Sequence, residues 1–310
     1  MSFLRRFAFL NPRKSKRWMG NKKKKYKVLQ VNPYTGKRLR AQNMRNLPGV
    51  VQITFSSKGA NSAWFGADMR EPPDKSDARL AFMNCNGLAY SDMNFFKSFL
   101  TQIKQCHTHY YGLAEININS CNTDLVQRMM CAVDEAIPGG SFQLRNTSIF
   151  DRAVEYQPGG VASGFQGRIS KYYGGSKMDE LGRWCCDEFK GPLKSVKIYT
   201  LYRVNPKPSN VGGGCTAWEQ QQLALRAQNI NIDPRHYVID SLIPVISEDI
   251  TKGFSIILMS DLNEGVQDRE RTNDRFSSIG LENLFHRAYT VVPPTYARGQ
   301  KTIDHIWMTF

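Results

Sequence analysis

The sequence predicts an α/β fold in which sheets form the interior and helices cover their outer faces. Short apolar segments typical of buried strands alternate with longer segments whose apolar residues recur at helical spacing. The alternation occurs in two halves of the chain, with a group of consecutive strands between them. Elements in this order pack as sheets between helices. The sequence shows no internal repeat.

The element boundaries follow from these patterns and from turn residues. The helix that begins near Ser91 or Asp92, either of which can cap it, ends before His109, and the next helix ends at Pro138-Gly139-Gly140. The first of these helices is expected to bury one face, made of Phe95, Phe96, Phe99, Leu100 and Ile103. Strands are predicted at 80–86, 111–119, 141–146, 160–166, 183–189, 194–204, 254–263 and 302–310, and helices at 92–107, 123–137, 218–227 and 236–250.

The positive charge is concentrated at the start of the chain. Residues 1–67 contain 16 Lys and Arg and no acidic residue, whereas the rest of the chain has 26 basic and 27 acidic residues. The composition changes at Pro72–Pro73, so we predict a basic, largely disordered extension at 1–76 and a folded domain at 77–310. Such an extension is suited to binding nucleic acid, because its basic residues would neutralise phosphates and release counterions. A nuclear import signal, an organellar presequence and a merely solvated tail stay open as alternatives.

Several classes of protein are disfavoured by composition. No apolar run approaches the roughly 20 residues of a membrane span. The seven cysteines include no C-x-x-C spacing, which indicates reduced thiols and a nuclear or cytoplasmic protein. Cys185 and Cys186 are expected to place one thiol on each face of a strand. Zinc is disfavoured because His107 and His109 have no cysteine at ligand spacing. We expect a monomer.

Polar residues gather where the predicted strands end. Strand ends of α/β sheets are where binding and catalytic sites are assembled. A single such residue is most often part of a turn, but several sets rich in carboxylate and amide indicate a site. These sets are Asn84 and Asn86, Glu115, Tyr202 and Asn205, and Asp261 and Asn263.

The order and spacing of these sets resemble the endonuclease/exonuclease/phosphatase superfamily. The resemblance covers residues 79–310 and rests on six short motifs in order: "NCNGL", "AE", "YRVN", "SDLN", "PPTY" and "TIDHIW". Each motif alone is weak, and their common order is the signal. The segments "GGVASGF", "LGRW", "WEQQQ" and "DPRHYVIDSLIPVI" are similar to the endonuclease domains of LINE-type retrotransposons.

The resemblance implies a four-layer α/β/β/α sandwich of two mixed sheets and a Mg²⁺-dependent phosphodiesterase site, in which Mn²⁺ could substitute. A hard cation on oxygen ligands suits phosphodiester hydrolysis. The resemblance assigns residues to metal binding and to catalysis. Glu115 would be the main metal ligand with Asn84 and Asn86 beside it, Asp261 oriented by Asn263 would accept from the attacking water, and Tyr202, Asn205 and Thr295 would contact the phosphate.

The last ten residues, "KTIDHIWMTF", bear on activity. In the superfamily, the aspartate of this motif supports the site and the essential histidine follows later, in a Ser-Asp-His motif. Asp304 is therefore expected to be the supporting aspartate and His305 a strand residue. The domain is expected to be truncated at its C-terminus, and its activity is in doubt. The sequence leaves three functions open: a DNA endonuclease, an inactive remnant that binds nucleic acid through its basic extension, and a phosphatase.

Overall fold

The computed structural model describes most of the predicted domain. The described residues are 72–73, 77–88, 93–147, 154–207, 216–264, 272–288, 292, 295 and 301–310, with short strands at 7–9, 54–55 and 63–64. The extension predicted to be disordered otherwise lies outside the described residues. The described residues include no helix long and apolar enough to cross a membrane.

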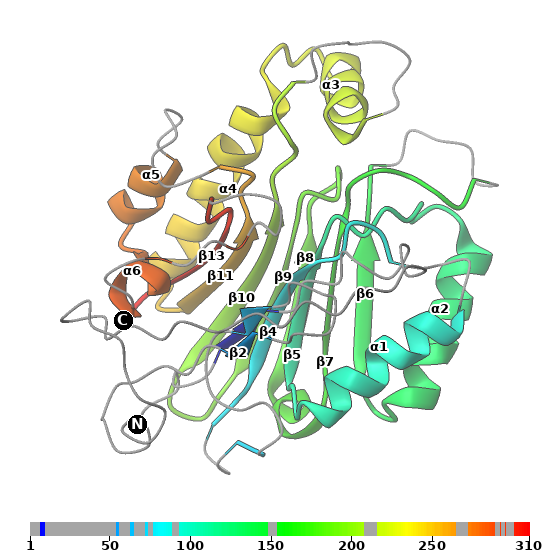
Figure 1. The fold of residues 1–310 in the computed structure, drawn as a ribbon. Coiled ribbons are helices and arrows are strands. Elements are labelled where there is room, and N and C mark those ends of the chain that lie inside the picture. The colour runs from blue at the N-terminus through cyan, green and yellow to red at the C-terminus, as the bar shows by residue number, and fades with distance from the viewer. Residues whose placement is uncertain are drawn as a thin grey trace.

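Two sheets face each other between helices, as the sequence predicts (Figure 1). Within the described residues, the first sheet has the strand order β1-β4-β5-β7-β6 and the second β12-β13-β11-β10-β9-β8. The strands of the first sheet are β1 (Phe7–Phe9), β4 (Leu80–Asn84), β5 (Tyr110–Ala114), β6 (Ser141–Arg145) and β7 (Val161–Phe165). Those of the second are β8 (Tyr173–Met178), β9 (Trp184–Lys190), β10 (Ser195–Tyr202), β11 (Ser255–Asp261), β12 (Glu282–Asn283) and β13 (Asp304–Met308). A small separate hairpin joins β2 (Thr54–Phe55) to β3 (Ala63–Trp64).

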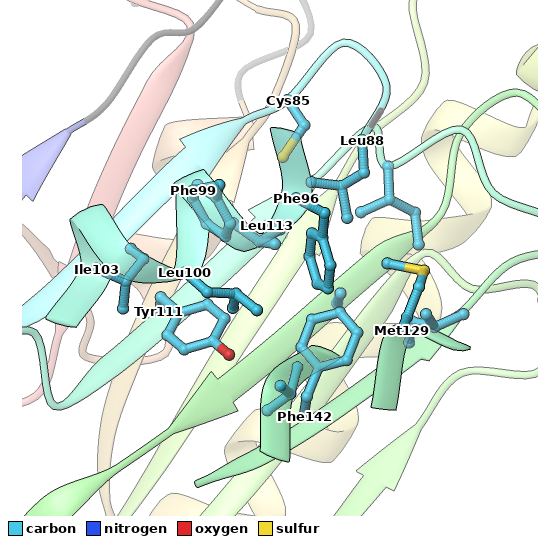
Figure 2. Close-up of a cluster of buried hydrophobic side chains, with 14 of the residues drawn as sticks. Cys85, Leu88, Phe96, Phe99, Leu100, Ile103, Tyr111, Leu113, Met129 and Phe142 are labelled. Carbon is cyan, nitrogen blue, oxygen red and sulfur yellow. The ribbon is translucent and has the colours of Figure 1, made fainter. Parts of the chain in front are cut away.

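Helices cover the outer face of each sheet. The helices α1 (Met93–Gln105) and α2 (Thr123–Ala136) lie on the first sheet, and α4 (Pro234–Thr251) and α5 (Thr272–Ser278) on the second (Figure 1). Figure 2 shows aromatic residues of α1 meeting those of the first sheet, where the rings of Phe99 and Tyr111 lie edge to face with centroids 6.1 Å apart. The remaining helical elements are η2 (Gly167–Tyr172), α3 (Ala217–Ala227) and α6 (Leu284–Ala288).

The alternation of side chains along strands divides the core into layers. Cys185 lies in the apolar layer between the sheets and Cys186 in the layer under α4, which confirms the prediction of one thiol on each face. Gly112 lets the two sheets approach closely, because a Cβ there would lie 2.3 Å from Oγ1 of Thr200 in the opposite sheet. The sheets are therefore packed directly against each other.

A buried carboxylate lies between the sheets. Asp187 Oδ2 accepts hydrogen bonds from Ser163 Oγ at 2.7 Å and Tyr110 Oη at 2.9 Å, and Oδ1 accepts one from Gln143 Nε2 at 2.6 Å. Burial raises the pKa of Asp187 to about 6, although the bonds from Ser163 and Tyr110 oppose the rise. The network ties three strands of the first sheet to β9 of the second.

Some predicted details are wrong. Phe95 was expected on the buried face of the first helix, but its side chain is 39% exposed. The strand expected at 111–119 ends at Ala114, because Glu115 takes a positive φ of 54° and leaves the extended conformation. Ser91 and Asp92, the expected caps of α1, lie outside the described residues.

Candidate active site

Four of the predicted residues meet at one edge of the two sheets. Asn84 is the last residue of β4, and Glu115 follows the last residue of its parallel neighbour β5. In the second sheet, Asp261 at the end of β11 lies opposite Asp304 at the start of β13. These residues are separated by up to 220 positions in the sequence, and strand pairing brings them together.

The Asn84 side chain connects the two sheets. Its Nδ2 donates to Glu115 Oε2 at 2.9 Å and also to Asp261 Oδ2. Its Oδ1 accepts from the backbone N–H of Asn86 at 2.8 Å, which fixes the orientation of the amide. One short side chain therefore holds a carboxylate from each sheet at hydrogen-bond distance.

Asp261 is fully buried in this cluster. Burial raises the pKa of its carboxyl group well above the usual value, and the negative charges of Asp304 and Glu115 raise it further. Hydrogen bonds from Asn84 and from the Asn263 backbone act in the opposite direction. The charged form of Asp261 therefore needs compensation by a cation or by hydrogen-bond donors.

Asn263 contacts Asp261 through its backbone. Its N–H donates to Asp261 Oδ1 at 3.0 Å, whereas its side-chain Nδ2 donates to the carbonyl oxygen of Arg203 at 2.7 Å. Asn263 takes a positive φ of 47°, and Asn86 does so at 44°. Asparagine tolerates this left-handed conformation better than most residues, which accounts for its use in both turns.

The remaining predicted residues lie around this cluster. Tyr202 is buried in the layer between the sheets, opposite Asp261 in the register of β10 and β11. Asn205 and Asn86 are exposed. Thr295 Oγ1 accepts from the backbone N–H groups of Ile303 and Asp304, each at 2.9 Å, and so anchors the start of β13. The phosphate contacts expected of Tyr202, Asn205 and Thr295 stay predictions.

His305 faces away from the cluster. Adjacent strand residues point to opposite faces, and Asp304 is directed to the site edge while His305 lies fully buried toward the helices. Its ring nitrogens lie 3.2 Å from Asn283 Nδ2 and 3.4 Å from the carbonyl oxygen of Glu264. Burial lowers the pKa of His305 to about 4. It is a core histidine with both nitrogens engaged, and it is not placed to touch a substrate.

Sequence reasoning missed a buried ionic cluster behind the site. Arg203 forms an ion pair with Glu264, and both side chains are only 1% exposed. Arg203 Nε donates to the carbonyl oxygen of Arg235 at 3.0 Å, and the Arg235 guanidinium donates to carbonyl oxygens of Val204 and Asn263. These contacts fix the chain just after β10 and β11. The sequence contained one sign of this pair: Arg203 in "YRVN" and Glu264 in "SDLNE" are charged residues that lie close to apolar strand residues.

The cluster contains only oxygen and amide groups, which suits a hard divalent cation. Mg²⁺ usually takes one or two carboxylates and keeps several waters. Glu115 is half-buried at the edge, with Asn84 beside it, and could hold such an ion. Among the described residues, no group of three or more His, Cys, Asp or Glu is placed to hold a metal together. The arrangement fits a largely hydrated ion and not a closed cage.

Comparison with known proteins supports the fold. No family model matches the chain, and no curated protein matches it either. Similar solved structures include the AP endonuclease LMAP from Leishmania major, with 14% identity, 74% of this chain and 78% of that chain covered, and a TM-score of 0.50. The 3' phosphatase NExo from Neisseria, bound to a product DNA hairpin, has 12% identity, 74% and 86% coverage, and a TM-score of 0.48. An endonuclease/exonuclease/phosphatase family protein from Leptotrichia buccalis has 11% identity, 74% and 87% coverage, and a TM-score of 0.45.

The likeness to LMAP concerns the fold. This chain shares with that AP endonuclease an arrangement of two mixed sheets between helices. A shared fold does not by itself determine the activity.

Proposed function

We propose that this chain hydrolyses phosphodiester bonds in DNA, with Mg²⁺ as its cofactor and with Mn²⁺ able to replace it. The observation that carries the proposal is the meeting of Asn84, Glu115, Asp261 and Asp304 at one edge, two from each sheet. A half-buried carboxylate that could hold a cation, beside a buried and oriented carboxylate that could accept from water, suits metal-assisted hydrolysis of a phosphodiester.

The residues divide into two tasks. Glu115, with Asn84 beside it, would hold the ion, whose chemistry would be to offset the negative charge that develops on the phosphate. Asp261 accepts a hydrogen bond from the attacking water and is kept in orientation by the backbone N–H of Asn263. Asp304 lies opposite Asp261 in the pairing of β11 with β13 and would support it. Tyr202, Asn205 and Thr295 would contact the phosphate.

Nucleic acid is the proposed substrate because of charge. The 16 basic residues of positions 1–67 occur without a single acidic residue. Lys207, two residues after Asn205, is exposed, and its Nζ lies 5.7 Å from the centre of the buried Trp218 ring. An exposed lysine beside the end of β10 suits a phosphate of the backbone. The retroelement-like segments of the sequence favour an endonuclease of that kind.

The test is nicking of supercoiled DNA with Mg²⁺ by the full chain and two matched variants. Glu115→Gln removes the main ligand, and the nicking rate is expected to fall at least about a hundredfold, as for loss of one transition-state contact. Glu135→Gln, an exposed glutamate on α2, is the control and should nick as the unchanged chain does.

Other outcomes identify the alternatives. Equal nicking by Glu115→Gln and the unchanged chain would contradict the proposed site. Release of phosphate from a 3'-phosphorylated oligonucleotide without nicking would identify a phosphatase. DNA binding with neither reaction would identify a nucleic-acid-binding protein without catalysis, which the basic extension favours as the second candidate.

A further inference from the structure

A second candidate site lies at the opposite edge of the first sheet. A pocket of about 330 Å³ opens where β4 and β5 begin and β7 ends. The candidate active site is at the other ends of β4 and β5, so the five residues of β5 separate the two places by about 13 Å along the strand. The residues that matter here are Lys104, His107, Thr108, His109, Gln166 and Arg168.

The wall of this pocket is built by the turn between α1 and β5. His107 takes a positive φ of 50°, and the N–H of Thr108 donates to the carbonyl oxygen of Ile103 at 3.1 Å, which ends the helix. Gln166, directly after β7, donates to this turn twice. Its side-chain Nε2 donates to the carbonyl oxygen of Thr108 at 2.7 Å. Its backbone N–H donates to the carbonyl oxygen of His109 at 2.8 Å. The pocket wall is therefore attached to the sheet and preformed.

The described residues that line the pocket include basic side chains and no acid. Lys104 and Arg168 are basic, and Lys104 Nζ also lies 3.5 Å from the carbonyl oxygen of Ala136. Burial lowers the pKa of His109 to about 4, and the charges of Arg168, Arg79 and His107 lower it further. His109 Nδ1 accepts from the backbone N–H of Arg79 at 3.0 Å, so the neutral ring carries its proton on Nε2.

Thr108 is a buried part of the pocket wall. Its side chain is 1% exposed, and it lines the pocket. Its Oγ1 is buried, and among the residues that the structure describes it has no hydrogen-bond partner. The hydroxyl is closed off from the pocket, so a ligand there meets the basic side chains around it.

We propose that this pocket binds a phosphate group, held by Lys104, His109 and Arg168. Phosphate offers several strong acceptor oxygens and negative charge, which matches a pocket whose described lining contains basic side chains and no acid. The group could belong to free phosphate or to the backbone of a bound nucleic acid, and both present the same chemistry. The site is separate from the candidate active site and does not depend on the proposed function.

Nuclear magnetic resonance of the histidine rings distinguishes the two sites. The chain has five histidines, and each ring gives its own carbon-bound proton signal, assigned by single His→Gln variants. Titration of the full chain with inorganic phosphate at constant ionic strength should move the signals of His107 and His109 saturably. The signals of His236, His286 and His305 should stay in place.

Charge-removing variants complete the test. The double variant Lys104→Gln/Arg168→Gln should weaken the phosphate effect on His107 and His109 at least about tenfold, since charge-assisted bonds are the strong ones. Lys97→Gln, on the same helix and paired with Glu135, is the matched control and should leave it unchanged. A single-stranded oligonucleotide in place of phosphate separates the two sources, because only a backbone-binding pocket responds to it. Absence of a saturable shift at His107 and His109, or an equal shift in the double variant, would overturn the proposal.

Discussion

Glu115 has a backbone conformation that residues other than glycine rarely adopt. Its φ of 54° places it in the left-handed region, where contact between Cβ and the following carbonyl oxygen costs roughly 1–2 kcal/mol. Its carbonyl oxygen accepts from the N–H of Gly87 at 2.7 Å, which helps hold the conformation. The turn directs the carboxylate off the strand and toward Asn84. Strain of this kind is common at functional sites.

A comparison of two substitutions at this position separates strain from function. Glu115→Ala keeps the unfavourable backbone, whereas Glu115→Gly relieves it, and both remove the carboxylate. The free energy of unfolding of Glu115→Gly is expected to exceed that of Glu115→Ala by about 1 kcal/mol, measured by urea unfolding. Both variants should lose nicking equally. A more stable alanine variant would mean that the left-handed conformation is not strained.

The end of β11 is held by an ionic cluster buried behind the site. Arg203 and Glu264 pair with both side chains 1% exposed, and Glu264 also accepts from the N–H and hydroxyl groups of Thr272, at 3.2 and 2.5 Å. Glu264 therefore joins the ends of β10 and β11 to the start of α5. Removal of one member of such a pair leaves a buried charge without compensation.

Glu264→Gln is expected to lower the free energy of unfolding by about 3–5 kcal/mol, because Arg203 loses its counter-charge. The matched control is Glu282→Gln, whose partner Arg287 and own side chain are 56% and 57% exposed, and it should cost less than about 1 kcal/mol. Urea unfolding of both variants measures the difference. Equal costs would show that the buried pair contributes no more than a surface pair.

Elements with strong periodicity could be predicted from the sequence, and elements defined by their neighbours could not. The helices α1, α2 and α4 have apolar faces that the pattern locates. Strand β8, "YGGSKM", has two glycines and mostly exposed side chains, and its place is set by pairing with β9. Asn84, Glu115 and Asp261 could be predicted because each lies at or just after the end of a recognisable strand, whereas Asp304 begins β13 and was assigned from the motif "TIDHIW". The Arg203–Glu264 pair could not, because a charged residue after an apolar strand normally marks an exit to solvent.

The two sheets share one buried carboxylate, and the stability of the whole domain should depend on its charge. The pKa of Asp187 is about 6 in the folded protein and near 3.8 when unfolded, so the folded state binds the proton more tightly. Its contribution to stability is full below about pH 4 and is lost as pH rises through about 6. Each pKa unit corresponds to about 1.4 kcal/mol, which gives a loss of about 3 kcal/mol.

Asp187→Asn should remove this part of the pH dependence. The amide stays neutral, and Gln143 can rotate to present its oxygen to the new amide nitrogen. The measurement is the free energy of unfolding between pH 4 and pH 8 for both proteins. As pH rises, the free energy of unfolding of Asp187→Asn should increase relative to that of the unchanged protein. Parallel curves would contradict the assigned pKa.

Each sheet is built, β1 aside, from one continuous half of the chain, and each half supplies two of the four residues at the site. The proposed active site therefore lies where the two halves meet, and its geometry depends on how the two sheets pack on each other. Displacement of reacting groups by about 1 Å can cost a hundredfold in rate. A methyl group added at Gly112, or a loosened contact at Asp187, would change the alignment of Glu115 with Asp261 without touching either. If the proposed activity holds, substitutions anywhere in the interface between the two halves should alter the rate.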